Sequence, residues 1–431
     1  MIETQAAFAG RPFIFEATLA GRAFSAGPEG KLTYRVTLDP GVTGITTSGS
    51  IIRGTATEAV TTRVTIVASN ANGDTATQQF RIVFFDSSLT TPSLPQQASA
   101  YADARVLPPR HFVIAAAGSV LAADNTPPDN PISDAGAALG RVLFYDKRLS
   151  SNDRVACSSC HQQAAGFSDT LRFSVGIHGG HTAVHSMALA NARYYRRGRF
   201  FWDERAASLE DQVLRPIQDT LEMGTTLENL EAKLRVTPFY APLFDAAFGS
   251  TAITSDRIAR ALSQFVRSML SADARFDRTF DAFGQPDLRS FTAAEAEGLQ
   301  LFNVSGCASC HRTNAQVSDG PSNTGLDVNA SSGVAGTGAF KAPSLRNVAV
   351  RRFFMHDGRF SSLEAVVAFY DSVIQMNPNL ERRLRSPDGS VALRLNLSAS
   401  QRTALVAYLG TLTDSSFLAA EKYSSPFRSI Q

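Results

Sequence analysis

The sequence of 431 residues predicts a multidomain protein, with an all-β sandwich at the N-terminus followed by two mainly α-helical halves. Hydrophobic residues alternate with polar ones in the first 87 residues, as they do in half-buried strands. Farther along the chain they recur three and four positions apart, which is typical of helices. Each helical half also carries one Cys-x-x-Cys-His motif near its start. A chain of this length exceeds what a single hydrophobic core usually holds.

The N-terminal region, residues 1–87, contains runs with period-two alternation at residues 32–38, 64–68 and 80–84. Asn72-Gly73 lies between the last two runs and predicts a hairpin, because both residue types tolerate a positive φ. The region resembles the Ig-like or cadherin-like domains that are appended to many exported bacterial proteins. This resemblance implies a spacing or adhesion role, although a passive folding unit explains the same pattern.

Residues 88–108 are predicted to form a polar linker that contains prolines. We expect a first helical domain over residues 109–286 and a second over residues 287–431. Amphipathic helix faces are predicted within residues 258–269 and 405–412. Helix starts are marked by residue pairs with capping-box spacing: Thr225 with Glu228, Thr292 with Glu295, and Ser398 with Gln401.

The cysteines form two pairs, and each pair is followed at once by a histidine. This spacing is the attachment signature of c-type haem, in which two thiols add to the haem vinyl groups and the histidine binds the iron. About 150 residues separate the pairs, far more than in a zinc site built from four cysteines. The sequence therefore predicts two covalently bound haem c groups. The motifs are Cys157-Ser-Ser-Cys160-His161 and Cys307-Ala-Ser-Cys310-His311.

The composition and the start of the chain bear on where the protein works. A net charge of +2 is too small for a nucleic-acid-binding surface, and no apolar run approaches the ~20 residues that cross a membrane. Bacteria normally attach haem covalently outside the cytoplasm, so we expect a periplasmic or secreted protein. The first residues lack the basic and apolar regions of a signal peptide. We therefore expect that an export signal has been removed or replaced by Met1.

Segments around both motifs resemble the bacterial dihaem cytochrome c peroxidase family, which includes the MauG maturation enzymes. They are residues 134–145, 200–206, 216–224, 342–348 and 355–360. The resemblance covers roughly residues 130–425 and does not extend to residues 1–87. It implies that the haem on His161 binds peroxide and that the haem on His311 receives or stores electrons. Trp202, the only tryptophan, matches the family residue that lies between the haems and assists electron transfer.

The same resemblance implies a catalytic pocket over the haem on His161. Glu222 matches the family acid in this pocket. A carboxyl group above the iron suits cleavage of an O–O bond, because a proton must move from the near to the far oxygen. Gln212 and Pro216 match further family positions, which implies that they shape access and hydrogen bonding.

The axial ligands differ within the family, and the resemblance leaves them open. A loop histidine often binds the first iron and must leave before peroxide enters; either His178 or His181 matches it, or the iron is open, as in MauG. At the second haem, Tyr370 stands where peroxidases have a methionine and MauG has a tyrosine. Met376 is the alternative ligand. A tyrosinate favours oxidised iron and lowers the potential, opposite to methionine.

The resemblance also bears on a calcium ion, which family members often hold between their haem domains with an asparagine side chain and backbone carbonyls. His185 stands at the asparagine position and is a poor substitute for an oxygen ligand. Carbonyls near Arg351 and Phe353 remain as ligands. Family members are often dimers, which makes a homodimer one expected state.

The function implied first is reduction of hydrogen peroxide to water, with electrons from a small donor such as a cytochrome c or a cupredoxin. The alternative is a MauG-like enzyme that uses a high-valent iron state to oxidise or modify another protein, and Tyr370 supports it. A non-enzymatic dihaem electron carrier is the third hypothesis. It requires both irons to be tightly six-coordinate and leaves Glu222 without a role.

Overall fold

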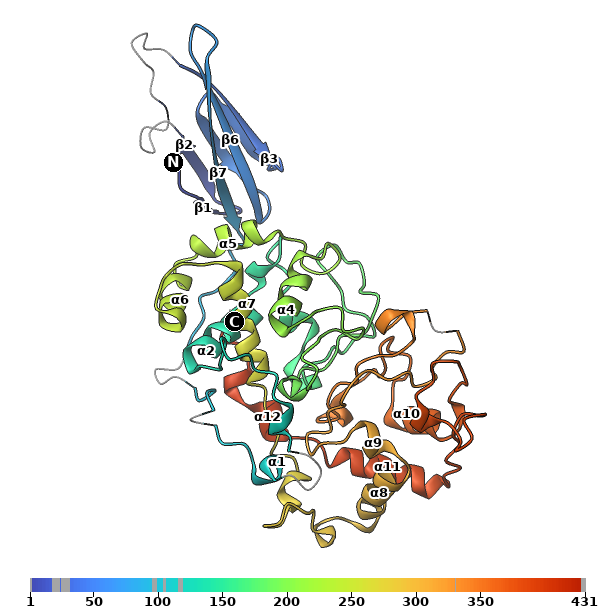
Figure 1. The fold of residues 1–431 in the computed structure, drawn as a ribbon. Helices are drawn as coiled ribbons and strands as arrows, with labels where there is room; N and C mark the ends of the chain where they lie inside the picture. The colour runs from blue at the N-terminus through green and yellow to red at the C-terminus, as the bar shows by residue number, and fades with distance from the viewer. Residues whose placement is uncertain are drawn as a thin grey trace.

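The computed structural model describes residues 2–17, 24, 32–94, 99–103, 106–114, 119–329 and 331–427. A β-sandwich forms one end of the chain and is followed by two helical halves (Figure 1). The expected fold class is therefore confirmed. Parts of the predicted linker, residues 95–98 and 104–105, lie outside the described residues. Among the residues that are described, no helix is long and apolar enough to cross a membrane.

The sandwich consists of two sheets whose facing sides enclose a core that includes Ile52, Val64 and Phe84. One sheet has the strand order β1-β7-β6-β3, in which β1 runs parallel to β7, and the other has the order β2-β5-β4. The three predicted runs of alternation fall in β3, β6 and β7. The strands are β1 (Gln5–Phe8), β2 (Pro12–Glu16), β3 (Thr33–Asp39), β4 (Ile45–Ser48), β5 (Ile51–Thr55), β6 (Val60–Ser69) and β7 (Thr75–Phe85).

The hairpin predicted at Asn72-Gly73 connects β6 to β7, whose last and first residues pair as Ser69 with Thr75. The connection is longer than a two-residue turn. The side-chain oxygen of Asn70 accepts hydrogen bonds from the backbone N–H groups of Asn72 (3.0 Å) and Asp74 (2.9 Å). Gly73 has a φ of 86°, which is why glycine suits this position.

The helical halves repeat one arrangement, in which a helix precedes each haem motif and packs on a later long helix. In the first half α2 packs on α7, and in the second α8 packs on α11. Gly140 allows α2 and α7 to pack closely, because a Cβ atom at this position would lie only 2.0 Å from the carbonyl oxygen of Ala261. Gly298 does the same for α8 and α11, because a Cβ atom there would lie 2.0 Å from the carbonyl oxygen of Ala404.

The helices of the first half are α1 (Arg110–Val113), α2 (Asp134–Tyr145), α3 (Cys157–Cys160), α4 (Leu209–Gln218), α5 (Leu227–Arg235), α6 (Tyr240–Phe248) and α7 (Ser255–Arg267). Those of the second half are α8 (Ala293–Val304), α9 (Cys307–Cys310), α10 (Leu363–Ala368), α11 (Ala399–Gly410) and α12 (Ser415–Ala419). One turn of π-helix, Phe369–Val373, continues α10.

Two of the three predicted capping boxes are confirmed. Thr292 caps α8 and Ser398 caps α11, each with the reciprocal side-chain bond. The third prediction is wrong by one residue, because Thr226 caps α5. The backbone N–H of Thr225 instead donates to the carbonyl of Ile217 (3.0 Å) and so belongs to the preceding turn. This shift places Asn229, which cannot supply the acidic half of a capping box, at the third helical position.

The C-terminal segment, residues 414–427, returns to the first helical half, so that α12 lies beside it in Figure 1. Phe417 and Tyr423 belong to the buried core of that half. The hydroxyl of Tyr145 donates to the carbonyl of Tyr423 (2.6 Å). The chain therefore closes the first core with residues that follow the second haem motif.

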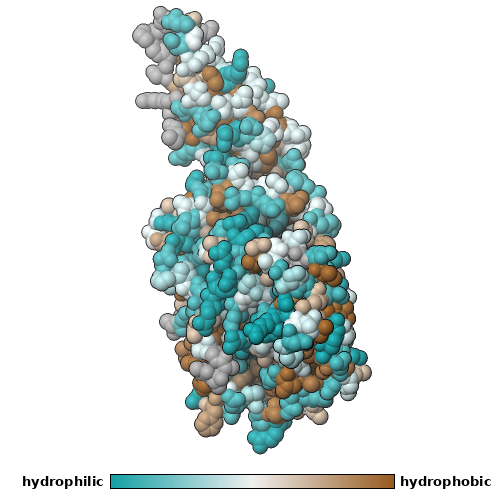
Figure 2. Space-filling view, turned by 45° about the vertical axis from the view of Figure 1, so that its right-hand side comes forward, coloured by the Kyte–Doolittle hydropathy of each residue, from teal (hydrophilic) through white to brown (hydrophobic). Residues whose placement is uncertain are grey.

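The sandwich contacts the first half where β7 meets α5. Arg81 donates to the side-chain oxygen of Asn229 (3.2 Å), and the N–H of Asp86 donates to the carboxylate of Asp153 (3.1 Å). Asp153 is buried and also binds Lys233 at 2.5 Å. In the space-filling view the sandwich forms a narrow extension of the wider helical part (Figure 2).

Candidate functional site

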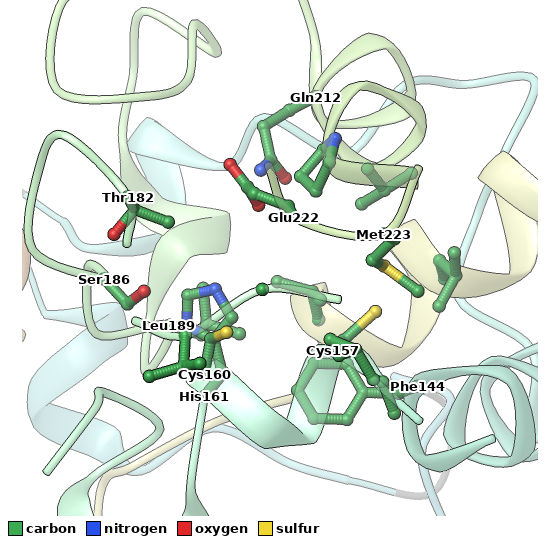
Figure 3. A pocket seen from close by; sticks show the side chains of 18 residues that line it. Phe144, Cys157, Cys160, His161, Thr182, Ser186, Leu189, Gln212, Glu222 and Met223 are labelled. Carbon is green, nitrogen blue, oxygen red and sulfur yellow. The ribbon is translucent and has the colours of Figure 1, made fainter. Parts of the chain in front are cut away.

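The first helical half encloses a cavity with the first haem motif on one side and the predicted catalytic residues on the other. Figure 3 shows Gln212 and Glu222 opposite His161 and the two cysteines. Its empty volume of about 700 Å³ lies within the range of cofactor and ligand sites. The structure thus brings together residues that are up to 65 positions apart. The predicted residues that line the cavity are Cys157, Cys160, His161, Gln212, Pro216 and Glu222.

His161 is held in the orientation that a metal ligand needs. Its Nδ1 lies 3.1 Å from the carbonyl oxygen of Phe167, so that Nδ1 carries the proton and Nε2 remains available. Phe167 adopts a φ of 59°, which turns its carbonyl toward the ring. Burial lowers the pKa of His161 and keeps the imidazole neutral, which is the form that binds a metal.

Glu222 lies in the turn after α4, and its backbone carbonyl accepts a hydrogen bond from Ile177 (3.1 Å). Its carboxyl group lines the cavity and makes no hydrogen bond to any residue that the structure describes. Burial, helped by the nearby charge of Asp219, raises the pKa of Glu222 to about 7. A carboxyl group with this pKa can take up and release a proton near neutral pH.

Pro216 lies inside α4, four residues after Gln212, and both residues line the cavity. Because proline has no N–H, the carbonyl of Gln212 lacks the usual helical hydrogen bond. The sequence places these two residues at helical spacing, so that they face the cavity together.

Neither loop histidine lines the first cavity. His178 and His181 are both exposed, and the ring of His181 contacts the backbone carbonyl of Phe173 at 3.3 Å. The loop turns sharply at Gly176, where a Cβ atom would meet the carbonyl oxygen of Leu221. Gly176 and Thr182, on either side of the two histidines, line the cavity instead.

The second helical half contains a larger cavity, with an empty volume of about 1730 Å³. It is lined by Cys307, Cys310 and His311, and also by Trp202 and Tyr370. Burial lowers the pKa of His311 to about 4, so its imidazole is neutral. Trp202 comes from the first half of the chain, which makes this wall of the cavity a junction between the halves.

Tyr370 lies on the π-helical turn that follows α10. Such turns often occur at functional sites, because they rotate a side chain out of the regular helical order. Burial raises the pKa of Tyr370 above its ordinary value. Met376 does not line the cavity and packs in an apolar cluster with Phe369 and Ile374. Met355, which the sequence did not single out, lines the cavity and has a φ of 70°.

Trp202 lines the second cavity, close to the wall that the two cavities share at Ser186. Its indole N–H donates to the backbone carbonyl of His185 at 2.7 Å, and its ring centre is 6.4 Å from that of His356. Ser186, the residue after His185, lines both cavities. A short path of contacts therefore leads from one cavity through Ser186 and His185 to Trp202.

The two cavities differ in charge, which sequence reasoning missed. The first is lined by the carboxyl group of Glu222 and by no lysine or arginine among the described residues. The second is lined by Lys341, Arg351 and Arg383, and by no aspartate or glutamate among them. Lys341 is 4% exposed, and burial lowers its pKa to about 7. Local sequence gives no signal for a buried lysine, because its burial depends on residues far along the chain.

The residues present fit two c-type haems. Burial raises the pKa of Cys157 to about 12 and that of Cys307 to about 11, so both are neutral thiols. Each cysteine pair lines its own cavity beside a neutral histidine, which excludes a zinc site shared by the two pairs. Nδ1 of His311 is buried without a hydrogen bond that satisfies ordinary geometry, and apolar side chains form most of the remaining walls.

The fold and the two sites define a c-type cytochrome with two haem-binding halves, one of which has a buried carboxyl group that faces its haem-motif histidine. The chain belongs to the di-haem cytochrome c peroxidase family, whose sequence profile matches residues 134–283 and 300–413. Members of this family are oxidoreductases that carry haem c.

Individual relatives fall into both branches of the family. The chain is 34% identical to the methylamine utilization protein MauG of Methylorubrum extorquens over 297 residues, which are 66% of this chain and 80% of that protein. It is 30% identical to cytochrome c551 peroxidase of Pseudomonas aeruginosa over 291 residues, which are 63% of this chain and 81% of that protein. The crystal structure of a MauG-like protein associated with microbial copper homeostasis superposes with a TM-score of 0.60 at 30% identity, over 78% of this chain and 99% of that one.

Proposed function

We propose that this protein reduces hydrogen peroxide to water in the first cavity, using electrons that a small redox protein delivers to the second. The observation that carries the proposal is the carboxyl group of Glu222, which faces His161 across the cavity and has a pKa of about 7. The overall reaction consumes one peroxide, two electrons and two protons, and yields two waters. A cytochrome c or a cupredoxin is the donor class that suits such a reaction.

The role of this chain in the first cavity is to hold peroxide and move its protons. A haem iron held by His161 would supply the electrons. The carboxylate of Glu222 would accept the proton of one peroxide oxygen and return it to the other oxygen, which leaves as water when the O–O bond breaks. Gln212 offers a side-chain amide beside Glu222 to orient peroxide, and Pro216 narrows the approach.

In this proposal, electrons enter at the second cavity and pass from there to the first. Trp202 connects it to the first cavity through His185 and Ser186. Tyr370 would hold the second iron together with His311, because it lines the cavity whereas Met376 does not. The exposed positions of His178 and His181 favour a first iron that is open to peroxide.

A second candidate function is MauG-like oxidation or modification of another protein. Tyr370 and the 34% identity to a MauG protein favour it. Stopped-flow spectroscopy of the fully oxidised protein with one equivalent of peroxide separates the two functions. An immediate reaction favours the MauG-like enzyme, whereas a reaction only after partial reduction favours the peroxidase. A pure electron carrier would react in neither state.

Replacing Glu222 by Gln tests the proposed chemistry. We expect peroxide turnover to fall by about 10²–10⁴-fold with haem content unchanged, because the amide cannot accept the proton. Glu228→Gln removes an exposed carboxyl in the next helix and is the control. Unchanged turnover in Glu222→Gln would remove Glu222 from the mechanism.

The proposal also covers the location of the protein, the roles of its two helical halves and the calcium position. We propose a periplasmic or secreted location, because covalent haem attachment takes place outside the bacterial cytoplasm. We assign the peroxide site to residues 109–286 and the site of electron uptake to residues 287–431. Calcium is disfavoured at the family position, because both ring nitrogens of His185 contact protein oxygen atoms.

A further inference from the structure

His185 joins four segments of the chain at the boundary of the two cavities. It is 4% exposed. Its ring nitrogens contact the hydroxyl of Ser168 and the carbonyl of Arg172, both at 3.0 Å. Its backbone N–H donates to the carbonyl of His356 at 2.8 Å, and its carbonyl accepts the indole N–H of Trp202 at 2.7 Å. The side chain therefore fixes the backbone group that holds Trp202.

The partners of the two ring nitrogens fix the orientation of the His185 ring. Nδ1 faces a carbonyl oxygen, which only accepts, so Nδ1 must carry a proton. Burial lowers the pKa of His185 and favours the neutral ring, so Nε2 carries no proton. The single hydroxyl proton of Ser168 is shared between this Nε2, 3.0 Å away, and the carbonyl of Ser186, 2.7 Å away. The ring of Phe353, centred 6.0 Å away, packs against it. The two ring contacts hold the ring in one orientation.

Trp202 depends on this anchor because an indole has a single donor. Its N–H bond to His185 is the one side-chain hydrogen bond that Trp202 makes within the described part of the chain. The direct neighbour of His185, Ser186, lines both cavities, and its carbonyl accepts from Ser168 at 2.7 Å. Ser168 thus holds both the ring of His185 and the wall that the cavities share.

We infer that His185 is a positioning residue, which orients Trp202 between the cavities and thereby sets the rate of electron transfer between the two haem sites. The rate claim rests on the proposed role of Trp202 as the electron relay. The anchoring claim stands on the hydrogen bonds alone. A displacement of the ring by about 1 Å is expected to slow the transfer substantially, since reactions that depend on position lose up to about 10²-fold on this scale.

The test uses the full chain loaded with both haems. Because Trp202 is the only tryptophan, ultraviolet resonance Raman spectroscopy reports its N–H hydrogen bond without interference from other indoles. We expect His185→Phe, which keeps a planar ring but removes both ring contacts, to shift the indole N–H signature toward a weaker bond. We also expect electron transfer between the haems, followed by stopped-flow absorption, to slow by about tenfold or more.

Two further variants keep the test decisive if His185→Phe fails to fold. Ser168→Ala removes one ring contact and should shift the same Raman signature by a smaller amount. Thr170→Val is the control, because its hydroxyl bonds to Gln162 in the same segment and does not reach His185. An unchanged indole signature in both His185→Phe and Ser168→Ala would overturn the inference.

Trp202→Phe separates this inference from the proposed function. If Trp202→Phe transfers electrons at the normal rate, the relay is wrong, and the rate part of the inference fails with it. If Trp202→Phe is slow while His185→Phe has both a normal indole signature and a normal rate, the relay stands and the role of His185 is wrong. Slow transfer in both variants, with a shifted signature in His185→Phe, supports both.

Discussion

Glu222 acquires its chemistry from its surroundings and not from its residue type. An exposed glutamate is ionised at neutral pH and has little tendency to hold a proton. Burial at the cavity wall, without a cationic partner in contact, raises the pKa of Glu222 to about 7. The same carboxyl group can then accept a proton and return it within one reaction.

This pKa predicts how turnover depends on pH. The carboxylate is the form that accepts the peroxide proton, so kcat/KM for peroxide should rise as the pH increases through about 7 and then level off. Steady-state assays between pH 5 and pH 9 measure the profile. In Glu222→Gln this rise should disappear. A rise that persists in the variant would assign the titration to another group.

The same group predicts an effect on stability. Because the pKa of Glu222 is raised in the folded state, its contribution to the free energy of unfolding is fully present below about 4.5 and is lost as the pH rises through about 7. The loss amounts to at most roughly 3 kcal/mol. Glu222→Gln should therefore gain stability over the natural protein between pH 5 and pH 8. Thermal unfolding of the variant and of the natural protein at pH 5 and pH 8 tests this. A stability difference between the two proteins that is the same at both pH values would contradict the prediction.

At the scale of elements, the π-helical turn after α10 decides which of its side chains lines the second cavity. The turn brings Tyr370 to the wall of the cavity and leaves Met376 in a neighbouring apolar cluster. A regular α-helix would have rotated the residues after Phe369 by part of a turn.

Two substitutions distinguish the candidate ligands. Tyr370→Met should raise the reduction potential of one haem by on the order of 100 mV, because a thioether stabilises reduced iron relative to a tyrosinate. Met376→Leu should leave both potentials unchanged. Spectroelectrochemical titration measures the two haems together. A shift in Met376→Leu and none in Tyr370→Met would reverse the assignment.

Features set by neighbouring residues could be predicted from the sequence, and features set by distant ones could not. The haem motifs and the caps at Thr292 and Ser398 depend on residues within four positions. The resemblance predicted that Glu222 lies in the same pocket as His161, and both residues line the first cavity. The burial of Lys341 depends on aromatic rings contributed by segments more than 100 residues away.

The N-cap of α5 could not be predicted for the same reason, because it depends on a contact outside the helix. Thr225 and Thr226 are adjacent and equally suited to cap a helix. The hydrogen bond from Thr225 to Ile217 keeps the first threonine in the preceding turn, and the helix starts after the second. The His185 contacts are also tertiary, since they join residues 168, 172, 202 and 356.

At the scale of the whole molecule, the described residues of the sandwich line neither cavity. Deleting residues 1–84 should leave the haem spectra and the peroxide turnover unchanged. It should lower the free energy of unfolding of the helical part by about 1 kcal/mol, because the bond between Arg81 and Asn229 is lost. Differential scanning calorimetry and peroxide assays of the shortened, haem-loaded chain measure both. A loss of turnover would give the sandwich a catalytic role.

The return of residues 414–427 to the first half has a consequence for biosynthesis. Phe417 and Tyr423 complete a core whose other members are synthesised much earlier. The core around Cys157 therefore cannot close until the last part of the chain is present. A chain that stopped before residue 414 would lack these core residues and leave the first half unfinished, although it would contain both haem motifs.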